Sequence, residues 1–372
     1  MKDWTKPDSK IVAFTLGFML LGLAMLFSAT GPIGMQRAHD SLFYVKRQLL
    51  AGVLPGTLFF LFFAFVDYRR WKPFAFFGLM VSIVLLMMVY VPGVGAVVNG
   101  SHGWIRMGTL LFQPSEIVKL AYLFYLAALL SNRGKGIDDP RAGMFPFLCS
   151  LGIVMLLLIL QPDTGSMAII VGMALTLYFL SGAPLIWFGG LAALGATFLW
   201  LLIRYSPYRA ARFMTFLHPE LDPLGVGYHI NQAILAIGSG GLWGLGYGHS
   251  RQKFLYLPEV ESDSIIAVMG EELGFIFLTV ILIAFAALVW RCLTIARQTP
   301  DRFGGYVAAG VGSWLAIQWL LNAGSMTGLL PMTGVTLPFV SHGGSAMATL
   351  LAAMGLVAGI PGRERARSSS SS

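Results

Sequence analysis

Acidic residues gather at one place in this sequence, just before an apolar stretch that begins at residue 265. Asp263 lies at the expected start of a helix, where free backbone N–H groups and the helix dipole favour a carboxylate. Such a carboxylate either caps the helix or acts as a general base that removes a proton from a substrate hydroxyl. The residues alone leave both interpretations of Asp263 open. Glu261 could hold a metal ion beside Asp263 or raise its pKa by like-charge repulsion.

Two further acids, Glu271 and Glu272, follow inside the apolar stretch. Glu271 lies two helical turns beyond Asp263 on the same face, whereas Glu272 points elsewhere. Buried acids of this kind pair internally more often than they catalyse, so we expect both to have partners within the protein.

Basic residues flank an uncharged, glycine-rich segment at 223–250 that precedes these acids. Guanidinium and ammonium groups bind phosphate oxygens through charge-assisted hydrogen bonds, so the cluster could hold a pyrophosphate. Contact with anionic lipid headgroups explains each of them equally well. The candidates are Arg204, Arg209, Arg212, Arg251 and Lys253.

Charged residues also occur inside a predicted membrane span. Glu116 and Lys119 are three residues apart, so they share one face of a helix and can pair. Asp163 is the expected additional partner of Lys119. Charge inside a membrane is costly and marks functional sites by default, yet buried ion pairs that only hold helices together are common. Both a structural network and direct substrate contact therefore remain open.

The composition defines the class of protein that must position these residues. Of 372 residues, 56% are hydrophobic and 11% are charged, whereas soluble proteins carry about 25% charge. We therefore predict an all-α integral membrane protein. The net charge of +8 is typical of basic cytoplasmic loops and does not require nucleic acid. The six His show no metal-ligand spacing, and the glycine-rich run lacks a P-loop ending, so no dedicated metal or cofactor site is predicted.

Apolar runs of about 20 residues predict membrane-spanning helices. Ten are expected, at 11–30, 48–66, 74–92, 111–131, 144–161, 166–181, 184–203, 265–290, 303–327 and 342–360. With a cytoplasmic N-terminus, this arrangement places most of the basic residues, including those of the C-terminal tail, inside the cell. An eleventh span at 223–250 would reverse that bias, and its glycines disfavour a spanning helix. The segment is therefore predicted to be re-entrant or interfacial, within a large outer loop at about 204–264 between the seventh and eighth spans.

The predicted organisation is a single polytopic domain over 1–367, with a disordered tail or cloning remnant at 368–372. Both termini are expected in the cytoplasm of a bacterium and the acidic cluster on the outer face of its inner membrane. Non-helical backbone at membrane depth must line a cavity or be covered by protein, so a cavity is expected at that face.

Several motifs now resemble a known family, the SEDS proteins FtsW, RodA and SpoVE, over about residues 11–360. Gln113-Pro114-Ser115-Glu116 and Gln161-Pro162-Asp163 resemble the family's intramembrane motifs. Leu257-Pro258-Glu259 resembles part of the family's large outer loop. Ser250-Arg251-Gln252-Lys253 and Leu329-Leu330-Pro331 resemble the division and sporulation branch more than the elongation branch. The loop with Ser341, Gly343, Gly344 and Ser345 resembles the one before the last span.

The resemblance implies a ten-span peptidoglycan glycosyltransferase that polymerises lipid II, with Asp263 at the position of the catalytic aspartate. It implies substrate contacts at Glu261, Ser341 and Ser345. The sequence departs from the family at Glu261 (His in relatives), Ser262 (Thr), Ser264 (an aromatic residue) and His342 (Tyr). A class B penicillin-binding protein and the division or elongation machinery are the implied partners, and Mg²⁺ or Mn²⁺ could accompany the substrate pyrophosphate. The alternatives are a lipid II flippase, which the charges at Glu116, Lys119 and Asp163 would suit, and a scaffold.

Overall fold

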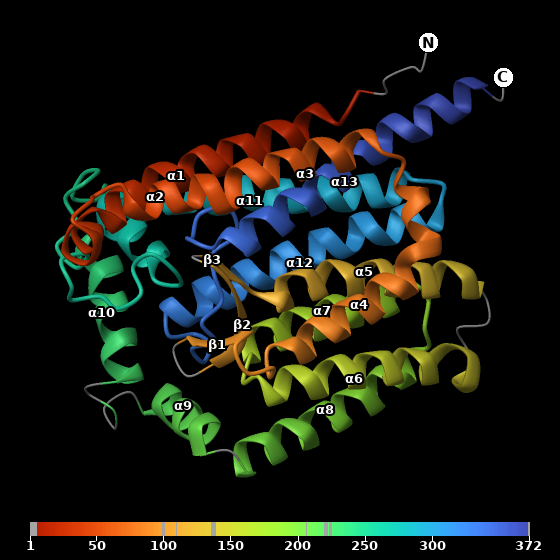
Figure 1. Ribbon diagram of the computed structural model, residues 1–372, viewed down its shortest axis with the longest axis horizontal. Helices are drawn as coiled ribbons and strands as arrows, with labels where there is room; N and C mark the ends of the chain where they lie inside the picture. The colour runs from red at the N-terminus through yellow and green to blue at the C-terminus, as the bar shows by residue number, and fades with distance from the viewer. Residues whose placement is uncertain are drawn as a thin grey trace.

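The computed structural model describes residues 6–98, 101–108, 110–134, 139–205, 207–218, 222 and 225–370, and these residues form mostly helices. The helices lie side by side, with α12 near the middle of the bundle and α8 at its edge (Figure 1). The N- and C-terminal ends of the chain lie at one end of the bundle, and α10 lies at the opposite end. The bounds are α1 Ser9–Ala38, α2 Phe43–Gln48, η1 Leu49–Val53, α3 Leu54–Phe65, η2 Tyr68–Phe74, α4 Ala75–Met88, α5 Pro114–Arg133, η4 Pro140–Met144, α6 Phe145–Leu160, α7 Thr164–Leu180, α8 Leu185–Tyr205, α9 Pro207–Leu217, α10 Val226–Ser239, α11 Ile265–Gln298, α12 Arg302–Met326 and α13 Gly344–Ser370.

A helix overlaps each of the ten ranges predicted to span the membrane. Seven helical stretches in the described part of the chain are long and apolar enough to cross a membrane, and α6 and α7 are apolar but shorter. The stretches that qualify are Ser9–Ala38, Phe43–Phe65, Tyr68–Met88, Pro114–Asn132, Leu185–Tyr205, Ile265–Gln298 and Gly344–Arg367. The structure therefore agrees with the prediction of a mostly helical protein with several membrane-spanning helices.

Apolar residues face outward on the peripheral helices and inward on the central ones, as expected when lipid is the solvent. Leu58 and Phe62 of α3 are exposed, whereas Val307 and Leu315 of α12 are fully buried. Small residues let the central helices approach closely. A Cβ added at Gly355 of α13 would lie 2.3 Å from the carbonyl oxygen of Phe60 on α3.

The segment at 223–250 contains a short helix, α10, of 14 residues, followed by turns that pack on α11. Helix α11 is broken at Gly274, which has φ 77°, and the turns satisfy the backbone groups that the break frees. Leu245 N–H donates to Glu271 O at 2.9 Å, and Phe275 N–H donates to Gly241 O at 2.9 Å. The prediction that this segment is not a spanning helix is confirmed, and its glycines permit this backbone-to-backbone contact.

The break divides α11 into two parts with different surroundings. Residues 265–272 are all buried within the protein, whereas Phe275, Ile276 and Phe277 are exposed. The lipid-facing part of α11 therefore begins about ten residues later than the predicted span at 265–290, because the first turns are covered by protein rather than lipid.

A small antiparallel sheet between α4 and α5 was not predicted. It consists of β1 Gly95–Val98, β2 Ser101–Met107 and β3 Leu110–Phe112, in the order β1-β2-β3. Gly95 pairs with Ile105, and Ile105 pairs with Phe112 on the other side. The sheet was missed because its strands are short and their apolar residues directly adjoin the apolar runs of the flanking helices in the sequence.

Candidate active site

Asp263 lies in a tight turn immediately before α11. Ser262 N–H and Ser264 N–H both donate to the carbonyl of Glu259, at 2.9 and 3.3 Å. Asn322 of α12 fixes the turn from the other side, because its Nδ2 donates to Asp263 O at 2.8 Å and to Val335 O at 2.7 Å. The N-cap position of α11 belongs to Ser264. The interpretation of Asp263 as a simple helix cap is therefore wrong.

The carboxyl group of Asp263 is buried, and only 6% of the residue is exposed. Burial, together with the negative charge of Glu259, raises the pKa of Asp263 to about 7. A hydrogen bond from the backbone N–H of Asp263 itself, the positive charge of Arg212 and the hydroxyl of Ser264 act in the opposite direction. A carboxyl group with a pKa near the working pH is suited to general base catalysis.

The basic residues predicted around the cavity have different positions in the structure. Arg212 of α9 donates from Nη1 to Met332 O at 3.2 Å, and its charge acts on Asp263. Arg204, at the end of α8, and Arg251 are exposed. The side chain of Arg209 lies outside the described part of the structure.

Lys253 was predicted to bind substrate, and the structure places it in a buried position with partners inside the protein. Its Nζ lies 2.8 Å from Glu272 Oε1 and donates to Gly248 O at 2.7 Å. Glu271 accepts hydrogen bonds from Ser250 Oγ at 2.5 Å and from Arg251 N–H at 2.9 Å. The internal pairing predicted for Glu271 and Glu272 is thus confirmed. The loop that carries Ser250, Arg251 and Lys253 therefore folds back onto α11. This contact could not be predicted from the position of the loop in the sequence.

Glu261 points to the connection between α1 and α2. Its Oε1 lies 3.3 Å from Arg37 Nη1 and accepts a hydrogen bond from Tyr44 Oη at 3.2 Å. Its Oε2 is buried and has no hydrogen-bond partner among the described residues. The like charge that raises the pKa of Asp263 comes from Glu259 and not from Glu261.

Three residues that were not predicted from the sequence belong to this part of the site, namely Arg37, Tyr44 and Arg47. Tyr44 packs edge-on against His342 with ring centroids 5.3 Å apart, and the charge of Arg47 acts on His342. Burial, together with Arg47, lowers the pKa of His342 to about 4. The signal that could have identified them is the presence of cations between the first two predicted spans, in a connection expected on the outer side, where the charge bias predicts few cations.

Ser341 and Ser345 hold backbone segments together. Ser341 Oγ donates to Ser262 O at 2.5 Å and accepts from Leu337 N–H at 2.8 Å. Ser345 Oγ accepts from Gln113 N–H at 3.1 Å, just before α5. The loop before α13 is thereby attached both to the turn that carries Asp263 and to the start of α5.

Glu116 and Lys119 form the predicted pair on α5, with Lys119 Nζ 2.7 Å from Glu116 Oε1 and both side chains buried. The Nζ of Lys119 also lies over the ring of Trp314, 5.1 Å from its centroid. Asp163 is not joined to Lys119 by any ion pair within the described residues. It caps α7 by accepting from Ser166 N–H at 2.9 Å, and Gln113 Nε2 lies 3.5 Å from its Oδ2.

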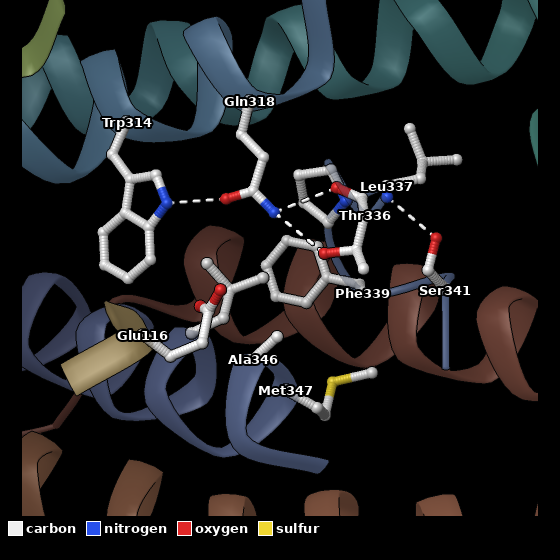
Figure 2. Close-up of a pocket in the computed structure, with 11 residues that line it drawn as sticks. Glu116, Trp314, Gln318, Thr336, Leu337, Phe339, Ser341, Ala346 and Met347 are labelled. Carbon is white, nitrogen blue, oxygen red and sulfur yellow. Dashed lines mark hydrogen bonds between the residues drawn. The ribbon is translucent and has the colours of Figure 1, made fainter. Parts of the chain in front are cut away.

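Glu116 also lines a small pocket between α5, α12 and the loop before α13 (Figure 2). Gln318 accepts from Trp314 Nε1 at 2.6 Å and donates to Thr336 O at 2.9 Å across this pocket. The enclosed space would hold about one water molecule.

No group of three or more His, Cys, Asp or Glu side chains within the described residues is placed to hold a metal ion. Cys149 and Cys292 are both free.

Comparison with known proteins gives consistent results over nearly the whole chain. A family model described as "Cell cycle protein", which covers FtsW, RodA and SpoVE, matches residues 9–366. Stage V sporulation protein E of Bacillus subtilis strain 168 is 42% identical over 354 residues, 95% of this chain and 96% of that protein. A probable peptidoglycan glycosyltransferase FtsW of Thioalkalivibrio sulfidiphilus is 38% identical, covering 94% of this chain and 88% of its own.

Solved structures show the same likeness. One chain of a peptidoglycan synthase complex, solved to study the coordination of polymerization and crosslinking, has a TM-score of 0.78 and 28% identity, covering 97% of this chain and 99% of its own. The rod shape determining protein RodA of Thermus thermophilus has a TM-score of 0.72 and 27% identity, covering 98% and 99%. From its motifs, its sequence relatives and its fold, the chain belongs to the FtsW, RodA and SpoVE family.

Proposed function

We propose that this protein is a peptidoglycan glycosyltransferase that polymerises lipid II, with Asp263 as its general base. The observation that carries the proposal is the buried Asp263 carboxyl, whose pKa is raised to about 7 by burial and by the negative charge of Glu259. A base with this pKa is partly ionised at neutral pH and can still accept a proton effectively. Relatives named as peptidoglycan glycosyltransferases support the reaction class.

In the proposed reaction, the 4-hydroxyl of the acceptor N-acetylglucosamine loses its proton to Asp263. The hydroxyl oxygen then attacks C1 of the donor N-acetylmuramic acid and forms the new glycosidic bond. The bond between C1 and the pyrophosphate oxygen breaks, and undecaprenyl pyrophosphate leaves with the bonding electrons. Attack from the side opposite the leaving group inverts the anomeric centre.

The leaving group must be neutralised as its negative charge develops. Among the predicted cations, the charge of Arg212 acts on Asp263, and Arg204 and Arg251 are exposed and available for the headgroup. Arg37 and Arg47 add positive charge from the connection between α1 and α2. A divalent cation, Mg²⁺ or Mn²⁺, would be carried by the pyrophosphate oxygens of the substrate.

The proposed membrane placement has ten spans, with both termini cytoplasmic and the site on the outer face of the inner membrane. The two ends of the chain lie at the end of the bundle opposite α10 (Figure 1), which supports opposite sides for the termini and the loop at about 204–264. A class B penicillin-binding protein is the proposed partner within the division or elongation machinery. The likeness to a chain of a peptidoglycan synthase complex supports such an assembly.

A flippase is the alternative function that the intramembrane charges would suit. Lys119 and Glu116 contact each other at 2.7 Å and are buried, and the pocket beside them has room for about one water molecule. A sugar headgroup would need a far wider path, so this state of the molecule favours the glycosyltransferase.

The discriminating experiment uses proteoliposomes that contain the purified protein and labelled lipid II in the outer leaflet only. Glycan strands should form there without any translocation. Their rate of formation is measured with the protein alone and with the transpeptidase partner added. Asp263→Ala, reconstituted identically, should yield none. Movement of lipid II to the inner leaflet without polymer would contradict the proposed function and favour a flippase.

A further inference from the structure

A second polar group lies behind Asp263, on the side formed by α10. Ser264 directly follows Asp263 in the chain, and it is fully buried. Its Oγ donates to Pro258 O at 2.7 Å and lies 3.5 Å from Asp263 Oδ1. The same oxygen is in close hydrogen-bond contact with Nε2 of His229, from α10.

The number of protons that Ser264 can donate determines which ring nitrogen of His229 carries a proton. A serine hydroxyl carries one proton, so when it donates to Pro258 or Asp263 it can only accept from His229. Burial, together with the charge of Arg212, lowers the pKa of His229 to about 4, so its ring is neutral at neutral pH. His229 must then carry its proton on Nε2 and donate it to Ser264.

Two acceptors therefore compete for the single proton of Ser264. The carbonyl of Pro258 holds it in this structure, and the carboxylate of Asp263 is just within reach. Catalytic hydrogen bonds are often long without substrate and shorten in the complex. An ionised carboxylate is a stronger acceptor than a carbonyl, so rotation of the hydroxyl toward Asp263 is favoured once Asp263 loses its proton.

We propose that Ser264, oriented by His229, is a positioning residue whose hydroxyl turns from Pro258 to Asp263 when that carboxyl ionises. The inference rests on the proposed role of Asp263 as the base. In the reaction, the hydroxyl would hold the ionised carboxylate toward the acceptor sugar and would return to Pro258 after Asp263 has taken the proton. No proton passes through Ser264 to His229.

The other charged groups around Asp263 do not duplicate this role. Glu259 in the same turn and Arg212 from α9 act on Asp263 by charge and in opposite directions. Glu261 directs its carboxylate to Arg37 and Tyr44. The neighbour from α12, Asn322, is neutral and contacts the backbone carbonyl of Asp263 rather than its carboxyl group.

The test compares Ser264→Ala with Ser264→Thr, which keeps the hydroxyl. Loss of the hydrogen bond should raise the pKa of Asp263, so the acidic limb of kcat/KM for lipid II polymerisation should move to higher pH by about one unit, with a loss of about tenfold on that limb. Ser264→Thr should restore the wild-type limb. His229→Phe should give a smaller shift in the same direction, and His229→Gln, which keeps a donor, should restore it.

The double variant Ser264→Ala/His229→Phe should be no worse than Ser264→Ala, because His229 acts only through the hydroxyl. Additive losses, or a limb that stays in place in Ser264→Ala, would overturn the proposal. A measurement that needs no activity separates it from the proposed function. The infrared C=O stretch of the protonated Asp263 carboxyl is assigned by its absence in Asp263→Asn. This band should titrate at higher pH in Ser264→Ala than in the wild type. If the wild-type protein is inactive but the band still shifts in Ser264→Ala, only the proposed function is refuted. If the titration is the same in both proteins, the role of Ser264 is refuted.

Discussion

Asp263 lies within ten residues of Glu271 and Glu272 along the chain, but its carboxyl group differs from theirs in its hydrogen-bond partners. Glu271 accepts three hydrogen bonds from the loop at 250–252, and Glu272 contacts Lys253 and Ser28. Asp263 is equally buried, yet its carboxyl has one side-chain donor at 3.5 Å. A buried carboxylate whose acceptor sites are filled holds the fold together. One that is buried with few hydrogen-bond donors has a raised pKa and is available for chemistry.

Replacing Asp263 by Asn should separate these two roles most strongly. Loss of the base should reduce polymerisation by about 10²–10⁴-fold. The fold should become more stable, because a carboxyl whose pKa is higher in the folded than in the unfolded state opposes folding when ionised. That opposition is absent below about pH 4 and grows as the pH rises to about 7. Thermal unfolding in detergent should therefore show a gain on the order of 2–4 kcal/mol at alkaline pH and almost none at acidic pH. Equal melting at both pH values would contradict the raised pKa.

Glu272→Gln should have the opposite outcome, with folding lost rather than chemistry. Lys253 would remain buried with its charge unpaired, at a cost of about 3–5 kcal/mol. Thermal unfolding of the purified protein measures this change. The double variant Lys253→Met/Glu272→Leu, which removes both charges, should recover most of the loss. A single variant that melts with the wild type would show that the pair contributes nothing.

Gly244→Ala tests the contact between the glycine-rich turns and the break in α11. An added Cβ would lie 2.2 Å from Glu272 O, and the residue has φ 80°, so strain alone should cost more than about 1 kcal/mol. Gly238→Ala is the matched control, because nothing lies within 4 Å of its added Cβ. The two variants should differ in unfolding temperature. Identical values would mean that the turns do not pack on α11 as described.

The pair Ser341→Ala and Ser345→Ala should have the smallest effects of the series. The Ser341→Ala variant is the more damaging of the two. It removes the hydroxyl that joins Ser262 O to Leu337 N–H, and leaving both groups unpaired should cost about 1–3 kcal/mol. Ser345→Ala loses one bond, to Gln113 N–H, and should cost less. Denaturation of the two variants side by side checks the order. A larger loss for Ser345→Ala would contradict the assignment of Ser341 to the turn that carries Asp263.

The comparison also shows what the sequence can reveal. Helix positions followed from long apolar runs, and Asp263 was selected as a candidate because its charge lies beside such a run. The pairing of Glu116 with Lys119 followed from helical spacing. Each of these depends on residues that are near one another in the chain.

Features that depend on distant segments were not accessible in the same way. Lys253 was predicted from its charge to bind the substrate pyrophosphate, and its ion pair with Glu272 depends on the folding of its loop onto α11. Asp163 was expected beside Lys119, but it caps its own helix. The break in α11 at Gly274 needs the turns at 241–246 to complete it, so the glycine pattern alone could not place it.

The most direct test of the central claim is the pH dependence of kcat/KM for lipid II polymerisation by the wild-type protein. Asp263 must be ionised to accept a proton, so the rate should rise with pH through an apparent pKa near 7 and disappear as the pH falls below it. The residual rate of Asp263→Asn should lack this limb. A wild-type limb near pH 4, where an unperturbed carboxyl titrates, or the same limb in Asp263→Asn, would contradict the account.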